Sequence, residues 1–198
     1  MFNHGAYPEI ESSFDEEGNY YAYTICDVPA GSPLRISYGD PTNPSFLFAR
    51  YGFLDESTEA TFCKIIPEHV NNDMEELGYA FDRMLFYKGG GVSEEVWDIL
   101  LYQHLNSTRT GDEQALMAAH RIGDYSTKQM LHEKYYGETS AMLLDHINTF
   151  LEMLDKLTKK ASDRARDLGD HPRIPLILQH NEFVKQAFLA VRMQNFGY

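Results

Sequence analysis

Cysteine is scarce in this chain, which has two cysteines, Cys26 and Cys63, in 198 residues. They lie far apart in the sequence and share no spacing with each other or with histidines that is typical of a metal site. Such scarcity is typical of a protein from a reducing compartment. We therefore expect each of the two cysteines to be an ordinary buried thiol.

Long apolar runs are also missing. No stretch approaches the roughly 18–20 consecutive apolar residues of a membrane span. Met1 to Glu11 contain neither the basic nor the apolar segment of a signal peptide, although an upstream targeting segment stays open. We expect an intracellular, soluble protein with no membrane partner, in the cytoplasm, the nucleus or a plastid. With 43% apolar residues, the chain has enough material for one ordinary domain or two small ones.

Basic residues are few: 17 lysines and arginines stand against 30 aspartates and glutamates, for a net charge of −13. A nucleic-acid-binding protein needs a positive face toward phosphate, so we expect no nucleic-acid partner. Acidic residues are dense near the N-terminus, at Glu9, Glu11, Asp15, Glu16, Glu17, Asp27, Asp40 and Asp55. This acidity would attract a cationic peptide or a lysine side chain. A merely soluble surface explains the same pattern.

Three kinds of site have no sequence support. The histidines show no His-x-x-x-His spacing, so no metal is expected. Gly89-Gly90-Gly91 lacks the Lys-Ser/Thr and the preceding strand of a phosphate loop, and is interpreted as a linker between helices. No Gly-x-Ser-x-Gly elbow is present, so nothing supports a serine hydrolase.

The first part of the chain is predicted to be rich in strands. Residues 19–39 are typical of two strands around a turn, because aromatic and β-branched residues flank the turn-forming run Pro29-Ala30-Gly31-Ser32-Pro33. Alternation places Tyr38 on one face with Leu34 and Ile36. A loop precedes the first strand, and a short helical turn or coil is expected over residues 44–51.

Beyond Pro67 the pattern becomes helical. Helical spacing predicts a helix through Met74, Leu77, Phe81, Met84 and Leu85. Ser93 is a predicted N-cap for the next helix, and capping boxes at Thr110 with Glu113 and Ser126 with Gln129 predict two more. A long helix passes through Met142 to Leu157 toward Gly169, and the last begins beyond Pro175. The fold class is therefore α+β, a small β-rich portion followed by a mostly α-helical lobe.

Three motifs follow one another within the first 53 residues: Asn3-His4-Gly5, Ile36-Ser37-Tyr38-Gly39, and Asn43 with Phe46, Leu47 and Phe48 before Tyr51-Gly52-Phe53. In that order and spacing they resemble the C-terminal half of a SET methyltransferase domain. The match is to the branch of the Rubisco large-subunit lysine methyltransferase, in which a helical substrate-binding lobe follows the SET domain. Gly5 replaces the usual serine of that family. The family's N-terminal half, with its Gly-x-Gly cofactor turn, would lie upstream.

The resemblance implies a site and a cofactor. Tyr38 matches the catalytic tyrosine, which also contacts the cofactor S-adenosyl-L-methionine. The other implied cofactor-binding residues are Asn3, His4, Tyr51 and Phe53. After Tyr51 this chain has only Cys63, whereas histone-type SET enzymes carry a zinc-binding cysteine segment there. The resemblance therefore implies a non-histone protein-lysine N-methyltransferase whose domains are residues 1–62 (SET portion) and 63–198 (substrate-binding lobe).

Methyl transfer suits tyrosines. The reaction needs a deprotonated amine, held in line with the methyl–sulfur bond in a site that excludes water. Tyrosine rings line an alkyl chain and their hydroxyls orient an amine without adding charge. The residues leave two alternatives open. The acceptor on the protein substrate is a lysine or a histidine, and without a complete cofactor site the chain is a non-catalytic protein-binding module.

Overall fold

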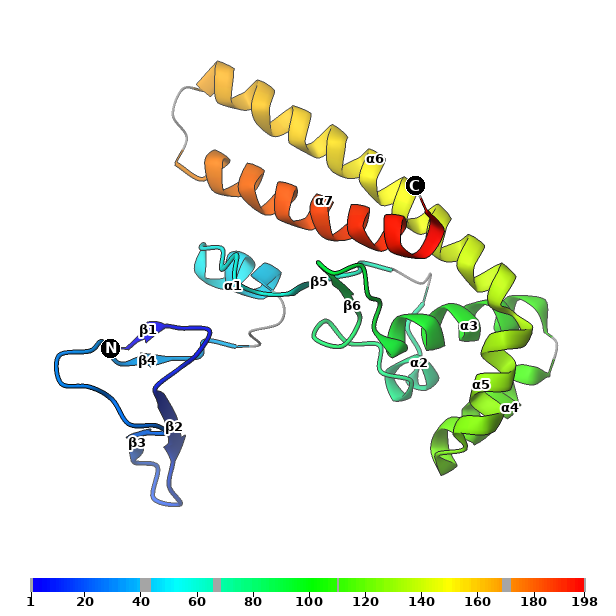
Figure 1. The fold of residues 1–198 in the computed structure, drawn as a ribbon, viewed down its shortest axis with the longest axis horizontal. Coiled ribbons are helices and arrows are strands. Elements are labelled where there is room, and N and C mark those ends of the chain that lie inside the picture. Colours follow the sequence, from blue (N-terminus) through cyan, green and yellow to red (C-terminus); the bar gives the residue numbers. More distant parts are fainter. Residues whose placement is uncertain (1, 40–43, 66–68, 110, 169–171, 198) are drawn as a thin grey trace. The chain divides into compact units, whose positions relative to one another are not determined.

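The computed structural model describes residues 2–39, 44–65, 69–109, 111–168 and 172–197, which form six strands and seven helices (Figure 1). The chain divides into two compact units, Met1–Thr58 and Glu59–Tyr198, which we call the sheet unit and the helical unit. The predicted α+β class, with strands before helices, is confirmed. The predicted boundary after residue 62 comes four residues late, because β5 (Ala60–Phe62) pairs with β6 (Leu85–Tyr87) inside the helical unit.

The sheet unit contains β1 (Asn3–His4), β2 (Ile10–Phe14), β3 (Tyr20–Thr24), β4 (Arg35–Ile36) and α1 (Pro44–Tyr51). The strand order is β1-β4-β2-β3. β4 is parallel to both of its neighbours, and β2 and β3 are antiparallel. The short α1 was expected over these residues, and Leu47 on it is fully buried.

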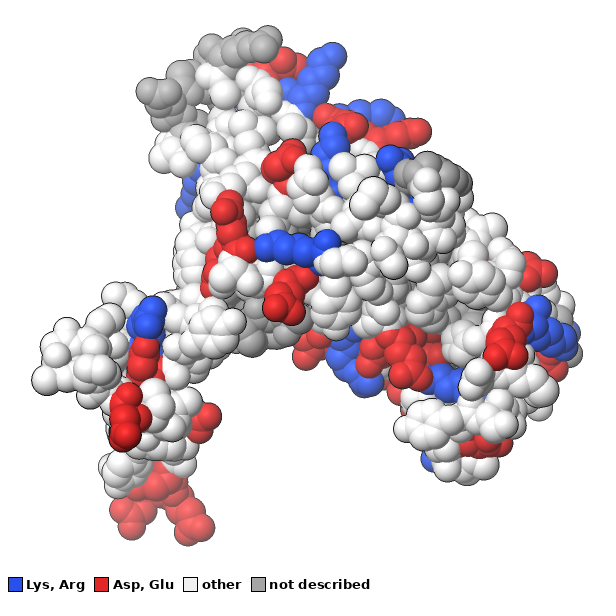
Figure 2. All heavy atoms as spheres, viewed as in Figure 1, with Lys and Arg blue, Asp and Glu red and all other residues white. Residues whose placement is uncertain are grey.

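The two strands predicted within residues 19–39 are present as β3 and β4. They are not neighbours in the sheet, and the hairpin joins β2 to β3, with Phe14 opposite Tyr20. Its turn is built by Asp15, whose carboxylate accepts the N–H groups of Glu17 and Asn19. These residues were predicted to be a plain loop, because the aspartate turn was not recognised. Figure 2 shows acidic side chains gathered at this turn.

The helical unit begins with the β5–β6 ribbon and the short α2 (Asn72–Glu76). Five longer helices follow: α3 (Glu94–Thr108), α4 (Asp112–Ile122), α5 (Tyr125–Lys134), α6 (Tyr136–Leu168) and α7 (Ile174–Phe196). α6 and α7 run side by side (Figure 1). The long helix and the last helix were both predicted. The last helix begins at Ile174 and not beyond Pro175, because a proline is tolerated in the first turn of a helix, where its missing N–H costs nothing.

The predicted helix through Met74 and Leu85 is wrong. α2 ends at Glu76, and Gly78 follows it with a φ of 95°, a conformation that favours glycine. Leu85 lies in β6 opposite Phe62. The three glycines at 89–91 form the turn after this strand, where the N–H of Gly90 bonds to the carbonyl of Tyr87. They are therefore not a linker between two helices.

The predicted helix caps are confirmed only in part. Ser93 is the N-cap residue of α3, although its hydroxyl accepts the N–H of Leu85 and makes no capping hydrogen bond. α5 begins at Tyr125, capped by Asp124, so the predicted Ser126 box is wrong. Thr110 lies outside the described residues, and the N-cap of α4 is Gly111.

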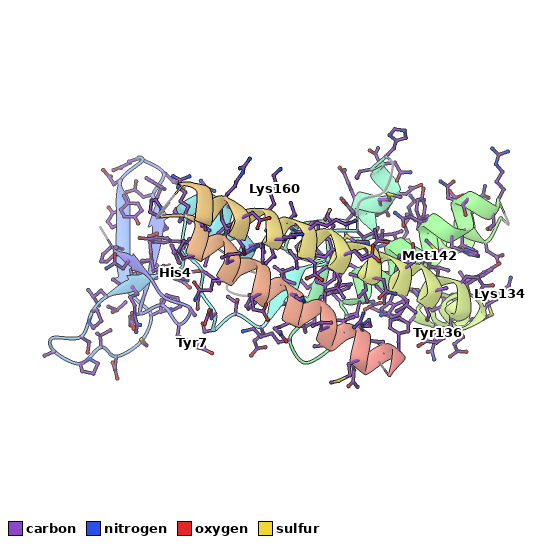
Figure 3. The ribbon with its side chains drawn as sticks, turned by 90° about the horizontal axis from the view of Figure 1, so that it is seen from above. His4, Tyr7, Lys134, Tyr136, Met142 and Lys160 are labelled. Carbon is purple, nitrogen blue, oxygen red and sulfur yellow. The ribbon has the colours of Figure 1, made fainter. Side chains whose placement is uncertain are left out.

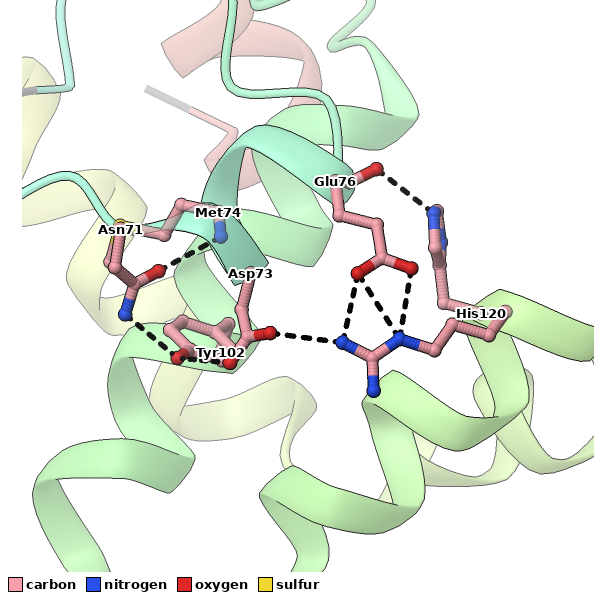
Figure 4. A network of polar contacts seen from close by, with 7 residues as sticks. Asn71, Asp73, Met74, Glu76, Tyr102 and His120 are labelled. Carbon is pink, nitrogen blue, oxygen red and sulfur yellow. Dashed lines mark hydrogen bonds and ion pairs between the residues drawn. The ribbon is translucent and has the colours of Figure 1, made fainter.

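A polar network ties α2 to α3 and α4 (Figure 4). The guanidinium of Arg121 donates to both carboxylate oxygens of Glu76 and to Asp73. Asp73 in turn accepts the hydroxyl of Tyr102, which accepts the side-chain amide of Asn71. The hydrogen bond from Arg121 lowers the pKa of Glu76. The network fixes a five-residue helix that would be unstable alone.

Three packed phenylalanine rings form the centre of the helical core. Phe188 on α7 is fully buried, with its ring 4.4 Å from that of Phe150 on α6 and 4.8 Å from that of Phe86 on β6. The carbonyl of Cys63 hydrogen-bonds to His146 on α6 at 2.7 Å. Burial raises the pKa of the Cys63 thiol to about 12, as for an inert buried cysteine. Cys26, by contrast, is exposed, so that part of the thiol prediction is wrong.

None of the described helices is both long enough and apolar enough to cross a membrane.

We predict that Phe188→Ala lowers the free energy of unfolding by about 3–5 kcal/mol, because it leaves a cavity between three elements. The control is Met193→Ala on the same helix, where the side chain is 66% exposed. Its effect should stay within about 0.5 kcal/mol. Urea unfolding followed by circular dichroism at helix wavelengths measures both. Equal losses in the two variants would contradict the packing described for Phe188.

Candidate functional site

The candidate site is built on the pairing of β1 with β4. Asn3 pairs with Arg35 and His4 with Ile36, and the N–H of Gly5 bonds to the carbonyl of Ile36 at 3.1 Å. The pairing holds the start of the chain against the segment that leads to Tyr38. The close approach of the two strands also favours glycine at position 5, since a Cβ there would lie 3.0 Å from the Cβ of Arg35.

His4 is fixed by two hydrogen bonds. Its Nδ1 accepts the backbone N–H of Tyr38 at 3.2 Å, and its Nε2 lies 3.3 Å from Oδ2 of Asp55. Because Nδ1 is an acceptor, the proton of the neutral ring is on Nε2 and is donated to Asp55. The side chain of His4 is only 8% exposed. His4 therefore positions the backbone of Tyr38.

Tyr38 is anchored through its hydroxyl as well as its backbone. The hydroxyl donates to the carbonyl of Phe2 at 2.6 Å. A phenolic oxygen that donates its proton still has lone pairs with which to accept. Tyr38 is therefore held at both ends by the first residues of the chain, and its oxygen can meet a further donor.

Aromatic rings surround Tyr38. Its ring centroid lies 4.9 Å from that of Tyr51, 5.5 Å from that of His4 and 6.3 Å from that of Phe53. Tyr51 is 44% exposed, so the cluster is open on that side. The guanidinium of Arg50 lies 5.7 Å from the Tyr51 ring centroid, within the range of a cation–π contact. We call His4, Tyr38, Tyr51 and Phe53 the ring cluster.

The structure thus brings together four of the five predicted site residues. The fifth, Asn3, is exposed, and as the neighbour of His4 on a strand it faces the other side of the sheet. Asn43, part of the third motif, lies outside the described residues. Among the residues that the structure does describe, no group of three or more His, Cys, Asp or Glu is placed to hold a metal ion.

Asp55 was not among the predicted site residues, and only its charge was noted. Its carboxylate accepts the hydroxyl and the backbone N–H of Ser57 as well as the contact from His4. Burial acts to raise the pKa of Asp55, but the hydrogen bonds from Ser57 and His4 outweigh it and the pKa is lowered. The Asp-x-Ser spacing is the signal that could have identified this turn.

Comparisons of this chain with models of protein families, with curated proteins and with solved structures found no match.

The lowered pKa of Asp55 predicts a pH dependence. The ionised carboxylate stabilises the sheet unit above the pKa of an unfolded aspartate, about 4, and this contribution is lost as pH falls through the lower folded value. Asp55→Asn should therefore lower the melting temperature of the sheet unit at pH 7. The difference from the parent should shrink steadily below about pH 4.

Thermal unfolding followed through NMR signals of the sheet unit makes this measurement. The control is Asp27→Asn, an exposed position in the same unit. A difference between Asp55→Asn and the parent that stays constant down to the lowest pH would show that the carboxylate charge is not involved.

Proposed function

We propose that this chain forms the C-terminal portion of an S-adenosylmethionine-dependent protein-lysine N-methyltransferase of the non-histone type, with Tyr38 as its catalytic tyrosine. The observation that carries the proposal is the ring cluster. Three motifs that are separated in the sequence converge on one tyrosine, whose hydroxyl proton is directed to the carbonyl of Phe2.

The anchored hydroxyl has a definite role in this proposal. Since its proton is committed to the Phe2 carbonyl, the oxygen of Tyr38 turns its lone pairs toward an incoming amine and accepts one of its N–H groups. The amine is thereby oriented for attack on the methyl group. Orientation is the main contribution that a protein makes to methyl transfer. The partly exposed ring of Tyr51 and the ring of Phe53 would line the alkyl chain of the acceptor.

The acceptor amine must also lose its proton. A free lysine has a pKa of about 10.4, and a cation nearby lowers it by favouring the neutral form. Arg50, beside Tyr51, supplies such a charge. S-adenosylmethionine would supply the activated methyl group and a second positive charge.

The ring cluster has groups that suit methyl transfer, but it does not form a complete cofactor site. The side chain of His4 is engaged by Tyr38 and Asp55, so only its backbone would be left for the cofactor. Asn3, exposed on the opposite face of β1, does not join the cluster. Isothermal titration with S-adenosylmethionine tests this part directly. Binding only by a version extended at the N-terminus with a Gly-x-Gly turn would assign the cofactor site to that longer protein.

We predict that Tyr38→Phe, in whichever version binds the cofactor, leaves cofactor affinity nearly unchanged because the ring still packs. The rate of methyl transfer should fall by roughly 10²-fold, the scale for loss of one positioned polar group at a reacting centre. The loss of the bond to Phe2 should cost only about 1 kcal/mol of stability. Single-turnover methyl transfer per folded molecule, measured beside thermal unfolding, separates the two effects.

The matched control is Tyr20→Phe, an exposed strand tyrosine of the same unit, which should change neither quantity. An unaltered rate in Tyr38→Phe would remove the catalytic role of Tyr38. Mass spectrometry of the product decides whether the acceptor is a lysine or a histidine.

A second candidate function is a non-catalytic protein-binding module, and one observation favours it. β3 is at the edge of the sheet, and all five of its residues are exposed, including Tyr20, Tyr21 and Tyr23. An exposed edge strand with aromatic side chains is a template on which an extended peptide adds a further strand.

This second function predicts that a partner binds without cofactor and that binding survives Tyr38→Phe. Replacing Tyr21 and Tyr23 by lysine should abolish binding, because charge on an edge strand opposes pairing. The measurement is a pulldown of the same partner with each variant, with deletion of residues 70–198 as the second arm. Capture that depends on the helical unit and not on the two tyrosines would contradict a role for β3.

A further inference from the structure

Three basic side chains whose charge depends on pH lie where α6 and α7 meet residues 63–65, which follow β5. They are Lys64, His146 on α6 and His180 on α7. α6 and α7 lie side by side in both views (Figures 1 and 3), and His146 belongs to the turns of α6 between Met142 and Lys160, which Figure 3 labels. Neither the proposed methyl transfer nor the edge strand β3 uses these three groups.

His180 is enclosed in the first half of α7. It is 7% exposed, and its neighbour Asn181 donates to the hydroxyl of Thr158 on α6 at 3.1 Å. Burial lowers the pKa of His180 to about 4, the charge of Lys64 acts in the same direction, and a hydrogen bond with Asn181 acts against both. Among the residues that the structure describes, Lys64 carries the charge that acts on this ring. His180 is therefore neutral at pH 7 while α7 is packed.

Lys64 is held in place by its surroundings. Cys63 and Ile65 on either side of it are buried, and the carbonyl of Ile65 accepts the hydroxyl of Tyr79 at 3.2 Å. The ammonium of Lys64 lies 5.1 Å from the centroid of the Phe150 ring on α6. Burial lowers the pKa of Lys64, whereas the ring face favours its charged form. A proton on His180 would therefore add a second buried positive charge near the first.

His146 is buried too, but its bond tolerates a proton. Its Nε2 donates to the carbonyl of Cys63 at 2.7 Å, because a carbonyl only accepts. Burial lowers the pKa of His146, and both this bond and the charge of Asp145 act to raise it. The protonated ring keeps the same donor for Cys63. Protonation of His146 therefore breaks no contact of α6.

The second half of α7 is anchored to β6 and to the turn after it. The ring of Phe188 lies 4.8 Å from that of Phe86, and the side-chain amide of Asn195 donates to the carbonyl of Gly90 at 3.1 Å. Neither contact includes a group that titrates between about pH 4 and pH 7. We therefore expect this half to stay packed when the pH falls.

Other charged groups lie along the first half of α7. The ammonium of Lys88 lies 4.5 Å from the centroid of the Phe183 ring, and Lys185 pairs with Asp155 on α6 at 2.7 Å. Ordinary carboxylates stay largely ionised above about pH 5, and lysines stay charged. These contacts therefore do not change between pH 7 and about pH 5, which leaves the imidazole of His180 as the group that responds.

We propose that acidification opens the first half of α7, residues 174–184, from α6 and from residues 63–65, with His180 as the group that takes up the proton. In the packed state the proton would be buried near Lys64, whereas in the open state water solvates it. Protons therefore favour the open state from the ordinary pKa of a histidine, about 6.5, down to that of the buried ring, about 4. The packed state is thus destabilised as the pH falls through this window. This device belongs to the helical unit and does not depend on the proposed function of Tyr38.

Hydrogen exchange of the full chain, followed by mass spectrometry from pH 7 to pH 5, measures the opening of each half of α7. After correction for the intrinsic exchange rate, the opening constant of residues 174–184 should rise roughly 20-fold as the pH falls over this range. That of residues 186–196 should change by less than about twofold. An equal rise in both halves would show unfolding of the whole unit and would overturn the proposal.

Matched variants assign the response to His180. His180→Gln has no ionisable ring and should remove the rise, whereas His69→Gln, at an exposed histidine of the same unit, should keep it. Lys64→Met removes the neighbouring charge and should make the rise smaller. Circular dichroism checks that each variant is folded.

A second measurement needs no variant. In an NMR titration of the parent chain, the ring of His180 should titrate well below the ordinary value for a histidine, about 6.5. Titration near 6.5, or a rise in opening that persists in His180→Gln, would each contradict the role of His180.

Discussion

The parallel pairing of β1 with β4 is the interaction on which the candidate site depends. It is only two residues long on each strand, and it is the reason that His4 lies beside the segment leading to Tyr38. The bonds from Tyr38 to His4 and Phe2 then close the arrangement. Because two-residue strands supply few hydrogen bonds, the side-chain contacts of His4 with Asp55 and Tyr38 carry much of the stability of this corner. His4 therefore both shapes the site and stabilises it.

The share of the fold that could be predicted from the sequence differs between the sheet unit and the helical unit. Long helices such as α6 repeat their apolar pattern over many turns, so their existence was predicted correctly. The predicted face of α6 is buried as far as Leu154, whereas Leu157 is 49% exposed. Short helices and short strands contain too few repeats of their apolar pattern to be distinguished from each other. Leu85 and Phe86 fit a helical stripe equally well, and only their partners on β5, more than twenty residues earlier, make them a strand. The same holds for β2, which becomes a strand through its pairing with β3.

For the candidate site, sequence order predicted which residues meet but not how they are held. His4, Tyr38, Tyr51 and Phe53 were proposed from the spacing of three motifs, and their rings do converge. Asp55 was missed because its role comes from a turn and from a histidine fifty-one positions away. The opposite orientation of Asn3 follows from strand alternation, which becomes applicable only once β1 is known to be a strand. Each of these points depends on contacts between residues far apart in the sequence, which local sequence patterns do not show.

The charge beside the ring cluster bears on the state of an amine that would enter it. The guanidinium of Arg50 lies 5.7 Å from the centroid of the Tyr51 ring. A cation in this position favours the neutral form of a neighbouring amine, and the neutral form is the one that methyl transfer requires. The position of Arg50 therefore bears on the proposed function as directly as the anchored hydroxyl of Tyr38 does.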